Sequence, residues 1–132
     1  MLEAMVALAM FALVTGIAVV GVRAFISQKS LAGWSDTIVN DIRGAQQLGI
    51  ARRAASVVTF TNGAPAAYTI QVGGATVRNQ TLPAPLTVST STIQFNTLGE
   101  PASGSTVSLT DGATGKTITI SVTPVTGAVT AQ

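Results

Sequence analysis

The sequence predicts an α+β fold in which one long N-terminal helix packs on a C-terminal antiparallel β-sheet domain. Three observations lead to this prediction. The chain begins with an apolar run, continues with apolar residues at helical spacing, and ends with short β-branched segments separated by turn residues. At 132 residues the chain has room for one domain of ordinary size.

The opening segment, "MLEAMVALAMFALVTGIAVVGVRAF", has nineteen residues from Ala4 to Val22 without a charge. A helix of that length is roughly 28 Å long, close to the thickness of the hydrocarbon core of a bilayer. Glu3 stands directly before this run. An ionised carboxylate there is costly unless it stays among the headgroups or meets a positive partner. Glu3 is therefore either an incidental residue at the membrane interface or a carboxylate that forms an ion pair with a positive partner.

The apolar run also has the hydrophobicity of a secretory signal peptide. It is longer than the usual apolar region of such a peptide, an acid replaces the basic start, and no A-x-A cleavage site follows it. We therefore interpret residues 1–25 as a retained membrane-spanning helix.

After Arg23 the apolar residues recur at steps of three and four, which places them on one face of a helix. This face comprises Leu31, Trp34, Ile38, Ile42, Ala45 and Leu48. No proline occurs before Pro65, so nothing forces the helix to end between Glu3 and about Ala55. We expect residues 26–56 to continue the first helix, with the apolar face and Trp34 packed under the sheet.

Residues 57–132 have the pattern of a small antiparallel β domain. The expected strands are "VVTFT", "AYTIQV", "ATVRNQTL", "LTVST", "TIQFN", "TVSLTD" and "KTITISVT". Turn signals such as Asn62-Gly63, Gly73-Gly74 and Asp111-Gly112 separate them, and turns this short join antiparallel strands. The region has 23 Ser and Thr residues and four charged ones. Its exposed face is therefore expected to be hydroxylated rather than charged.

The composition excludes much of the usual catalytic chemistry. Histidine and cysteine are absent, so the chain has no imidazole base, no thiol nucleophile, no disulfide and no Cys/His metal site. Its five acids offer no evident acid–base pair. We therefore expect no catalytic residue, no cofactor and no metal, which is the expectation for a protein that is not an enzyme.

The basic residues leave nucleic-acid binding open but not favoured. The net charge is only +2, so a phosphate-binding stripe requires most of the seven Lys and Arg residues to converge. Arg43, Arg52 and Arg53 are either a basic patch or a solvated helix end. Positive charge suits the C-terminal end of a helix dipole, and we prefer that interpretation.

A glutamate ahead of a long apolar helix, an amphipathic continuation and a β-rich domain resemble the plan of type IV pilins and pseudopilins. The stretch "LAGWSDTIVNDIRGAQQLGIARRAASVVTF" is similar to the GspH/FimT-type branch, in which an arginine- and alanine-rich helix end runs directly into a first strand. The ending "TIQFNTLGEPASGSTVSLTDGATGKTITISVTPVTGAVTAQ" resembles that branch by its pattern of strands closed by a Thr-Gly hairpin. The resemblance covers the whole chain.

The resemblance implies a role for Glu3. In this family a prepilin peptidase removes a leader, the new N-terminus is methylated, and the glutamate attracts the N-terminal amine of a neighbouring subunit during assembly. The family glutamate lies four residues after the mature N-terminus, whereas Glu3 lies two after Met1, so we expect residues to be missing before Met1. Pilin helices also melt locally in filaments. Gly16 and Gly21 weaken a helix by about 1 kcal/mol each, so we expect unwinding within Val14–Val22; close helix packing is an equal alternative.

The implied function is a structural pilin subunit of a type IV pilus, used for motility, adhesion or DNA uptake. Its partners would be copies of itself, other pilins, the prepilin peptidase, the pilus assembly platform and the secretin. It would lie in the inner membrane as a single-pass protein before assembly and in an extracellular filament afterwards.

Three alternatives remain: a minor pilin that binds DNA at the filament tip, a pseudopilin of a type II secretion or competence system, and a membrane sensor domain. DNA-binding relatives carry arginines in the closing hairpin, and Thr126–Thr130 has none.

Overall fold

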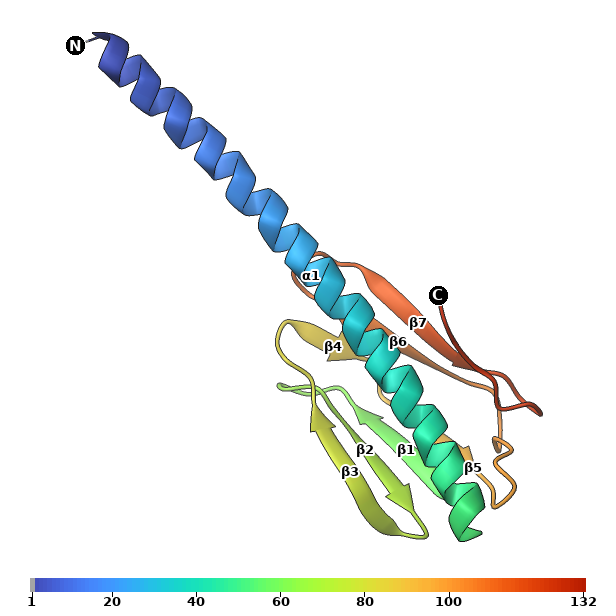
Figure 1. Cartoon of the computed structure of the whole chain (residues 1–132). Coiled ribbons are helices and arrows are strands. Elements are labelled where there is room, and N and C mark those ends of the chain that lie inside the picture. The colour runs from blue at the N-terminus through green and yellow to red at the C-terminus, as the bar shows by residue number, and fades with distance from the viewer. Residues whose placement is uncertain (1) are drawn as a thin grey trace.

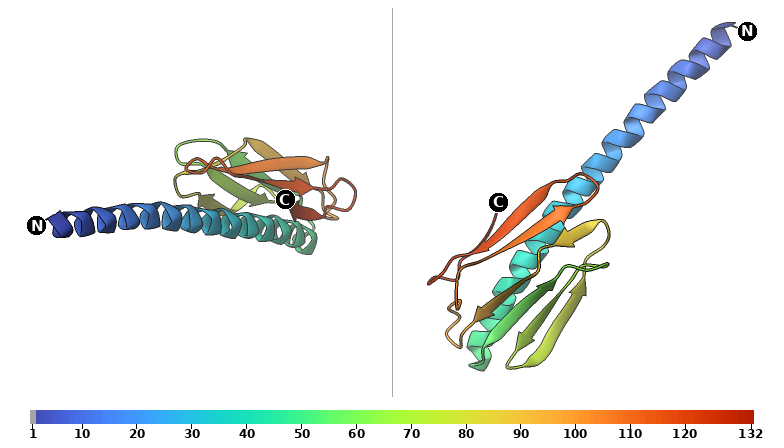
Figure 2. Two further views of the ribbon diagram at one scale, coloured as in Figure 1. Left: turned by 90° about the horizontal axis from the view of Figure 1, so that it is seen from above. Right: turned by 180° about the vertical axis from the view of Figure 1, so that it is seen from behind.

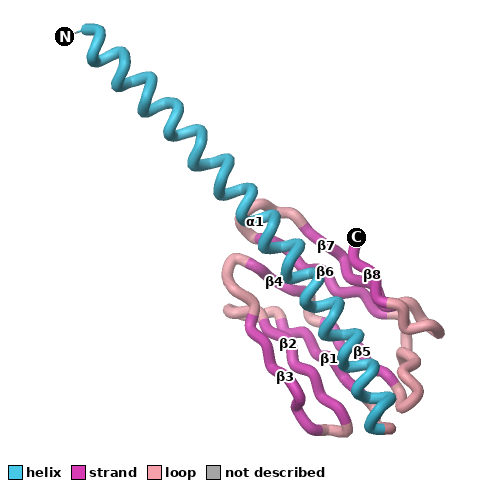
Figure 3. The backbone as a smooth tube through the Cα atoms, viewed as in Figure 1, coloured by secondary structure: helices cyan, strands magenta, loops and turns pink. Residues whose placement is uncertain are grey.

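The computed structural model describes the backbone of residues 2–132 and the side chains of residues 3–10 and 29–132. Over these residues the fold is α+β, with one long helix followed by antiparallel strands (Figures 1 and 3). The elements are α1 (Leu2–Arg52), β1 (Ser56–Thr61), β2 (Ala67–Val72), β3 (Ala75–Thr81), β4 (Leu86–Val88), β5 (Ser91–Phe95), β6 (Ser105–Asp111), β7 (Thr117–Val122) and β8 (Val129–Ala131).

Helix α1 is continuous over 51 residues, which confirms the predicted single helix. Its N-terminal part projects away from the strands, and its C-terminal part lies along them (Figure 1). The backbone is helical at Gly16 and Gly21, but their surroundings lie outside the described side chains. The predicted unwinding concerns the assembled filament and stays a prediction. The boundary between residues 25 and 26 also falls outside the described side chains, and the first buried helix residue is Leu31.

The strands form two sheets where the sequence pattern indicates only a set of antiparallel strands. Sheet A has the order β3-β2-β1-β5 and sheet B the order β4-β6-β7-β8, and every pairing is antiparallel. Both sheets lie on the same side of α1 (Figure 2). The chain passes from sheet B to sheet A between β4 and β5. There the Ser89 N–H donates to the Ser108 carbonyl, and the Ser108 N–H donates to the Ser89 hydroxyl, both at 2.9 Å. The chain then crosses to pair β5 with β1.

One hydrophobic core joins the helix to both sheets. On α1 the predicted face is buried at Leu31, Ile38, Ile42 and Ala45, while Trp34 is half-buried and packs against the core. Alternating strand residues complete it, as expected for strands with one face on the core. They include Val58, Phe60, Tyr68, Ile70, Ile93 and Phe95 from sheet A and Leu86, Val88, Val107, Leu109, Ile120, Val122 and Val129 from sheet B.

The C-terminal end of α1 has the hydrogen bonds of a Schellman motif. The Arg53 N–H bonds to the Ile50 carbonyl at 3.1 Å, and the Ala54 N–H bonds to the Gly49 carbonyl at 3.0 Å. Arg53 occupies the left-handed position with φ 51°, which glycine usually fills. The helix therefore ends at Arg52, three residues before the predicted end near Ala55.

Replacing Arg53 by glycine should stabilise the fold, since glycine adopts a positive φ without the clash of a Cβ atom. We expect Arg53→Gly to raise the free energy of unfolding by about 0.5–1 kcal/mol. Denaturant unfolding of the full chain in detergent micelles, followed by the fluorescence of the single tryptophan, measures this difference. Arg52→Gly is the matched control, because it removes a charge at a right-handed helical position and should destabilise. A loss of stability with Arg53→Gly would contradict the account.

Candidate functional site

The exposed N-terminal part of α1 is the first candidate site. Glu3 lies in the first turn and is exposed. The apolar side chains that follow are exposed as well, with Met5 at 73%, Leu8 at 74% and Met10 at 69%. A helix surface that is apolar on all sides is stable only when lipid or other protein covers it. The described part of this segment therefore has the chemistry of a contact surface.

Within the described residues, no helix combines the length and the hydropathy that a membrane crossing needs. Residues 11–25 of the predicted membrane-spanning helix have side chains that lie outside the described ones.

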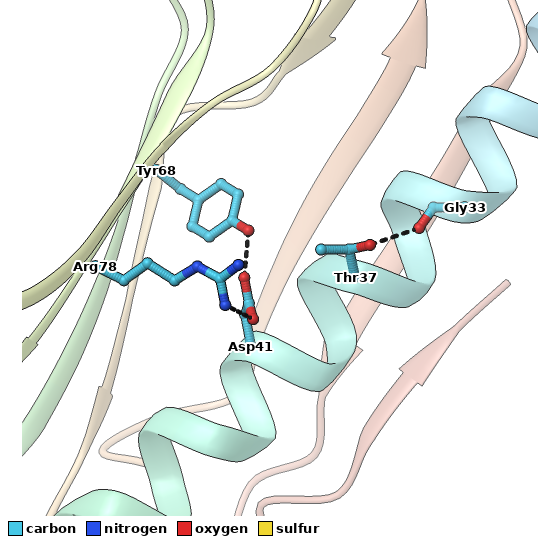
Figure 4. A network of polar contacts seen from close by, with 5 residues as sticks. All are labelled: Gly33, Thr37, Asp41, Tyr68 and Arg78. Carbon is cyan, nitrogen blue, oxygen red and sulfur yellow. Dashed lines mark hydrogen bonds and ion pairs between the residues drawn. The ribbon is translucent and has the colours of Figure 1, made fainter.

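A second candidate is the polar cluster that attaches α1 to sheet A (Figure 4). The Tyr68 hydroxyl donates to Asp41 Oδ2 at 2.5 Å, and Arg78 Nη1 donates to Asp41 Oδ1 at 2.6 Å. The Asp41 side chain is 11% exposed and the Arg78 side chain 48% exposed. One turn earlier Thr37 donates its hydroxyl to the Gly33 carbonyl at 2.9 Å. Each carboxylate oxygen of Asp41 thus has one donor from a different strand of sheet A.

Burial, and then the hydrogen bond to Asp41, raise the pKa of the Tyr68 phenol well above its ordinary value. The negative charge of Asp41 acts in the same direction, and the nearby charge of Arg78 acts against it. A neutral phenol beside a paired carboxylate is a stable hydrogen-bond donor. The cluster is therefore suited to holding the helix against the sheet and not to proton transfer near neutral pH.

Two further side chains attach α1 to the sheet B side of the domain. Arg43 Nη2 donates to the Val129 carbonyl of β8 at 2.8 Å, and Gln46 Nε2 donates to the Gly99 carbonyl at 2.6 Å. The loops that carry Gly99 and Gly127 approach the helix closely. A Cβ atom on Gly99 would lie 2.5 Å from Ile50 Cδ1, and one on Gly127 would lie 2.5 Å from Gln46 Nε2. Both glycines also have positive φ values, 81° and 65°.

The structure does not bring the three arginines of the predicted basic patch together. Arg43 and Arg52 are nine residues apart, which places them about 180° apart around the helix. The Arg43 guanidinium contacts the Val129 carbonyl, whereas Arg52 and Arg53 are exposed at the end of the helix.

A metal site is not evident in the described residues. No group of three or more His, Cys, Asp or Glu side chains there is placed to hold a metal ion. Asp111 is buried at the β6–β7 turn, where it accepts the Ala113 N–H at 2.8 Å and the Thr114 hydroxyl at 2.9 Å, which are contacts that shape the turn.

Comparison of the chain with protein-family models, curated proteins and solved structures gives no match.

The Tyr68 cluster generates a pH-dependent prediction. Tyr68 is the only tyrosine, so the absorbance of tyrosinate reports on this residue alone. An unfolded tyrosine has a pKa of about 10. Because the folded-state pKa is higher, the stabilisation is fully present below about pH 10 and is lost as the pH rises through the folded-state pKa. We expect the folded chain to remain mostly un-ionised at about pH 10.5, where the chain unfolded in guanidinium is more than half ionised.

Tyr68→Phe is the control for this titration. It should lower the free energy of unfolding by about 1–2 kcal/mol at neutral pH, because the half-buried Asp41 loses a donor. It should also remove the part of the pH dependence that belongs to the phenol. Ionisation of the folded protein near pH 10 would show that the hydroxyl is not held as described.

Proposed function

We propose that this protein is a structural subunit that polymerises through its N-terminal helix into a filament of the type IV pilus class. One observation carries the proposal. A single helix begins with a carboxylate and an exposed apolar surface and continues, without a break, into the core of a β-rich domain. A contact made by the first residues of α1 is thus coupled rigidly to the position of the domain.

The apolar segment suits two successive environments. In a bilayer its backbone groups are satisfied within the helix, so the single-pass form in the inner membrane is stable before assembly. In a filament, copies of the same segment pack on one another and exclude both water and lipid. The proposal therefore places the protein first in the inner membrane and then in an extracellular filament. It assigns the chain no catalytic residue and no cofactor.

Glu3 is proposed to set the register between subunits. A carboxylate that enters an apolar filament core needs a cation, and the N-terminal amine of a neighbouring copy supplies one. The partners in this account are copies of the same chain, other pilins, a prepilin peptidase, the assembly platform and a secretin. The alternative is that the chain is a GspH/FimT-like minor pilin or pseudopilin. Such a subunit would use the same contacts but would be less abundant in the filament.

DNA capture is not proposed for this chain. Arg43 contacts Val129, and Arg52 lies on the opposite side of the helix. A continuous phosphate-binding stripe needs several cations along one path, and this arrangement separates them.

Mass spectrometry of filaments sheared from the native cell tests the proposal. A major subunit should account for most of the protein in the filament preparation. A trace amount supports the minor-pilin or pseudopilin form. Complete absence from filaments and from secretion pseudopili would contradict the proposal.

Glu3→Gln should reduce the amount of filament by at least about tenfold while the membrane-inserted chain stays at its normal level. The amide keeps the shape of the side chain but leaves the incoming amine without an opposite charge in an apolar environment. Immunoblots of sheared and membrane fractions measure both quantities. Glu100→Gln, at an exposed acid of the β5–β6 loop, is the matched control and should assemble normally. Normal assembly of Glu3→Gln would remove Glu3 from the mechanism.

A further inference from the structure

A groove lies between α1 and β8, on the side of the domain that sheet B occupies. Its volume is about 440 Å³, and its lining comes from four helix residues and the last strand. These residues are Asp36, Val39, Asn40, Arg43, Val129, Thr130 and Ala131. Arg43 is fixed by the Val129 carbonyl, so the groove keeps its shape through a bond between its two walls.

Asp36 is the acid of this groove, and Arg43, its cation, lies about 10.5 Å further along the helix and bonds to the neutral Val129 carbonyl. The Asp36 side chain is exposed, and among the described residues it forms no ion pair; the salt bridge of that region joins Asp41 to Arg78. Val39, Val129 and Ala131 supply apolar walls beside it. The Asp36 end of the groove therefore fits a long side chain that has an apolar stem and a positive end, which describes arginine and lysine.

The end of α1 carries two such side chains. Arg52 and Arg53 are exposed and adjacent, and no acid pairs with them in the described part of the chain. Arg53 keeps its charged side chain at a left-handed position that favours glycine. A non-glycine residue at such a backbone position suggests that its side chain has a function.

The two sites lie on opposite flanks of α1. Asp36 precedes Arg43 by seven residues, close to two turns, so it shares the flank that faces β8. Arg52 follows Asp41 by eleven residues, close to three turns, so it shares the flank that faces Tyr68 and Arg78. Complementary sites on different faces cannot satisfy each other within one molecule, but they join identical molecules head to tail into an open filament.

We propose that the groove around Asp36 receives the Arg52–Arg53 pair of a second copy of this chain. The inference rests on the proposed function, because membrane-inserted subunits share one orientation and their helices then pack in parallel. Sixteen residues separate Asp36 from Arg52, which corresponds to about 24 Å along the helix axis. The filament should therefore contain a pair of neighbouring subunits with an axial stagger of about 24 Å.

Cysteine cross-linking in intact filaments tests the contact directly, because the chain has no cysteine of its own. A full-length variant with both Asp36→Cys and Arg52→Cys is treated with a short bifunctional maleimide. This reagent is preferred to oxidation because the two Cβ atoms of an Asp–Arg pair are farther apart than the 3.5–4.5 Å of a disulfide. A head-to-tail contact should give a ladder of dimers, trimers and higher multimers, and each single variant should give none.

The matched control combines Asp36→Cys with Gln47→Cys. Gln47 is exposed on the same half of α1 but does not share the flank of Arg52. The proposal expects no ladder from this pair. Filaments that form normally but give no Asp36–Arg52 ladder, or an equal ladder from the control, would overturn the inference while leaving the proposed function intact. If the unsubstituted chain forms no filament in its native cell, both the inference and the proposed function are overturned.

Charge exchange provides an independent readout. Asp36→Arg alone, and Arg52→Asp with Arg53→Asp, should each lower the amount of filament by at least about tenfold, and the three changes together should restore most of it. Lys116→Asp reverses the charge of an exposed residue at the β6–β7 turn, away from both sites, and should assemble normally. Failure of the combined variant to recover would contradict a direct contact between the two sites.

Discussion

The uncovered apolar surface at the start of α1 is the constraint on which the rest of this account depends. Met5, Leu8 and Met10 are each more than two-thirds exposed, and they lie on a segment that projects beyond both sheets (Figure 1). Water is an unfavourable solvent for such a surface, so it requires lipid or protein around it. A subunit that moves from a membrane into a filament satisfies this requirement in both places, and the carboxylate of Glu3 then acquires a role in choosing the partner.

The other half of α1 explains how such a contact positions a whole domain. Ile38 and Ile42 are fully buried against the sheets, and polar contacts hold each flank of the helix: Asp41 on sheet A, and Arg43 on sheet B. Because the helix is continuous, displacement or rotation of its first turns moves the β domain with it. The groove at Asp36 and the arginines at the helix end are thus presented at a fixed separation, which is what a repeating contact between identical subunits needs.

Local pattern was sufficient for most elements and insufficient for their pairing. The alternation in "AYTIQV" predicts β2 at the observed bounds, and the absence of proline predicts an unbroken helix. The predicted helix end near Ala55 lies three residues after the observed one, since the left-handed turn falls on Arg53 rather than on a glycine. The two sheets and the Asp41 cluster depend on contacts between residues far apart in sequence: Tyr68 lies 27 residues from Asp41 and Arg78 lies 37 from it. No local pattern encodes such contacts. The roles proposed for Glu3, Gly16 and Gly21 involve other copies of the chain, so a single subunit does not test them.

Cryo-electron microscopy of filaments from the native cell would show which parts of neighbouring subunits contact one another. The account predicts that the helical segments before Leu31 pack on one another along the filament axis, with Glu3 beside the N-terminus of a neighbouring copy and the β domains outside. A map in which these segments lie apart from one another, or in which the β domains alone make the contacts between subunits, would contradict the account.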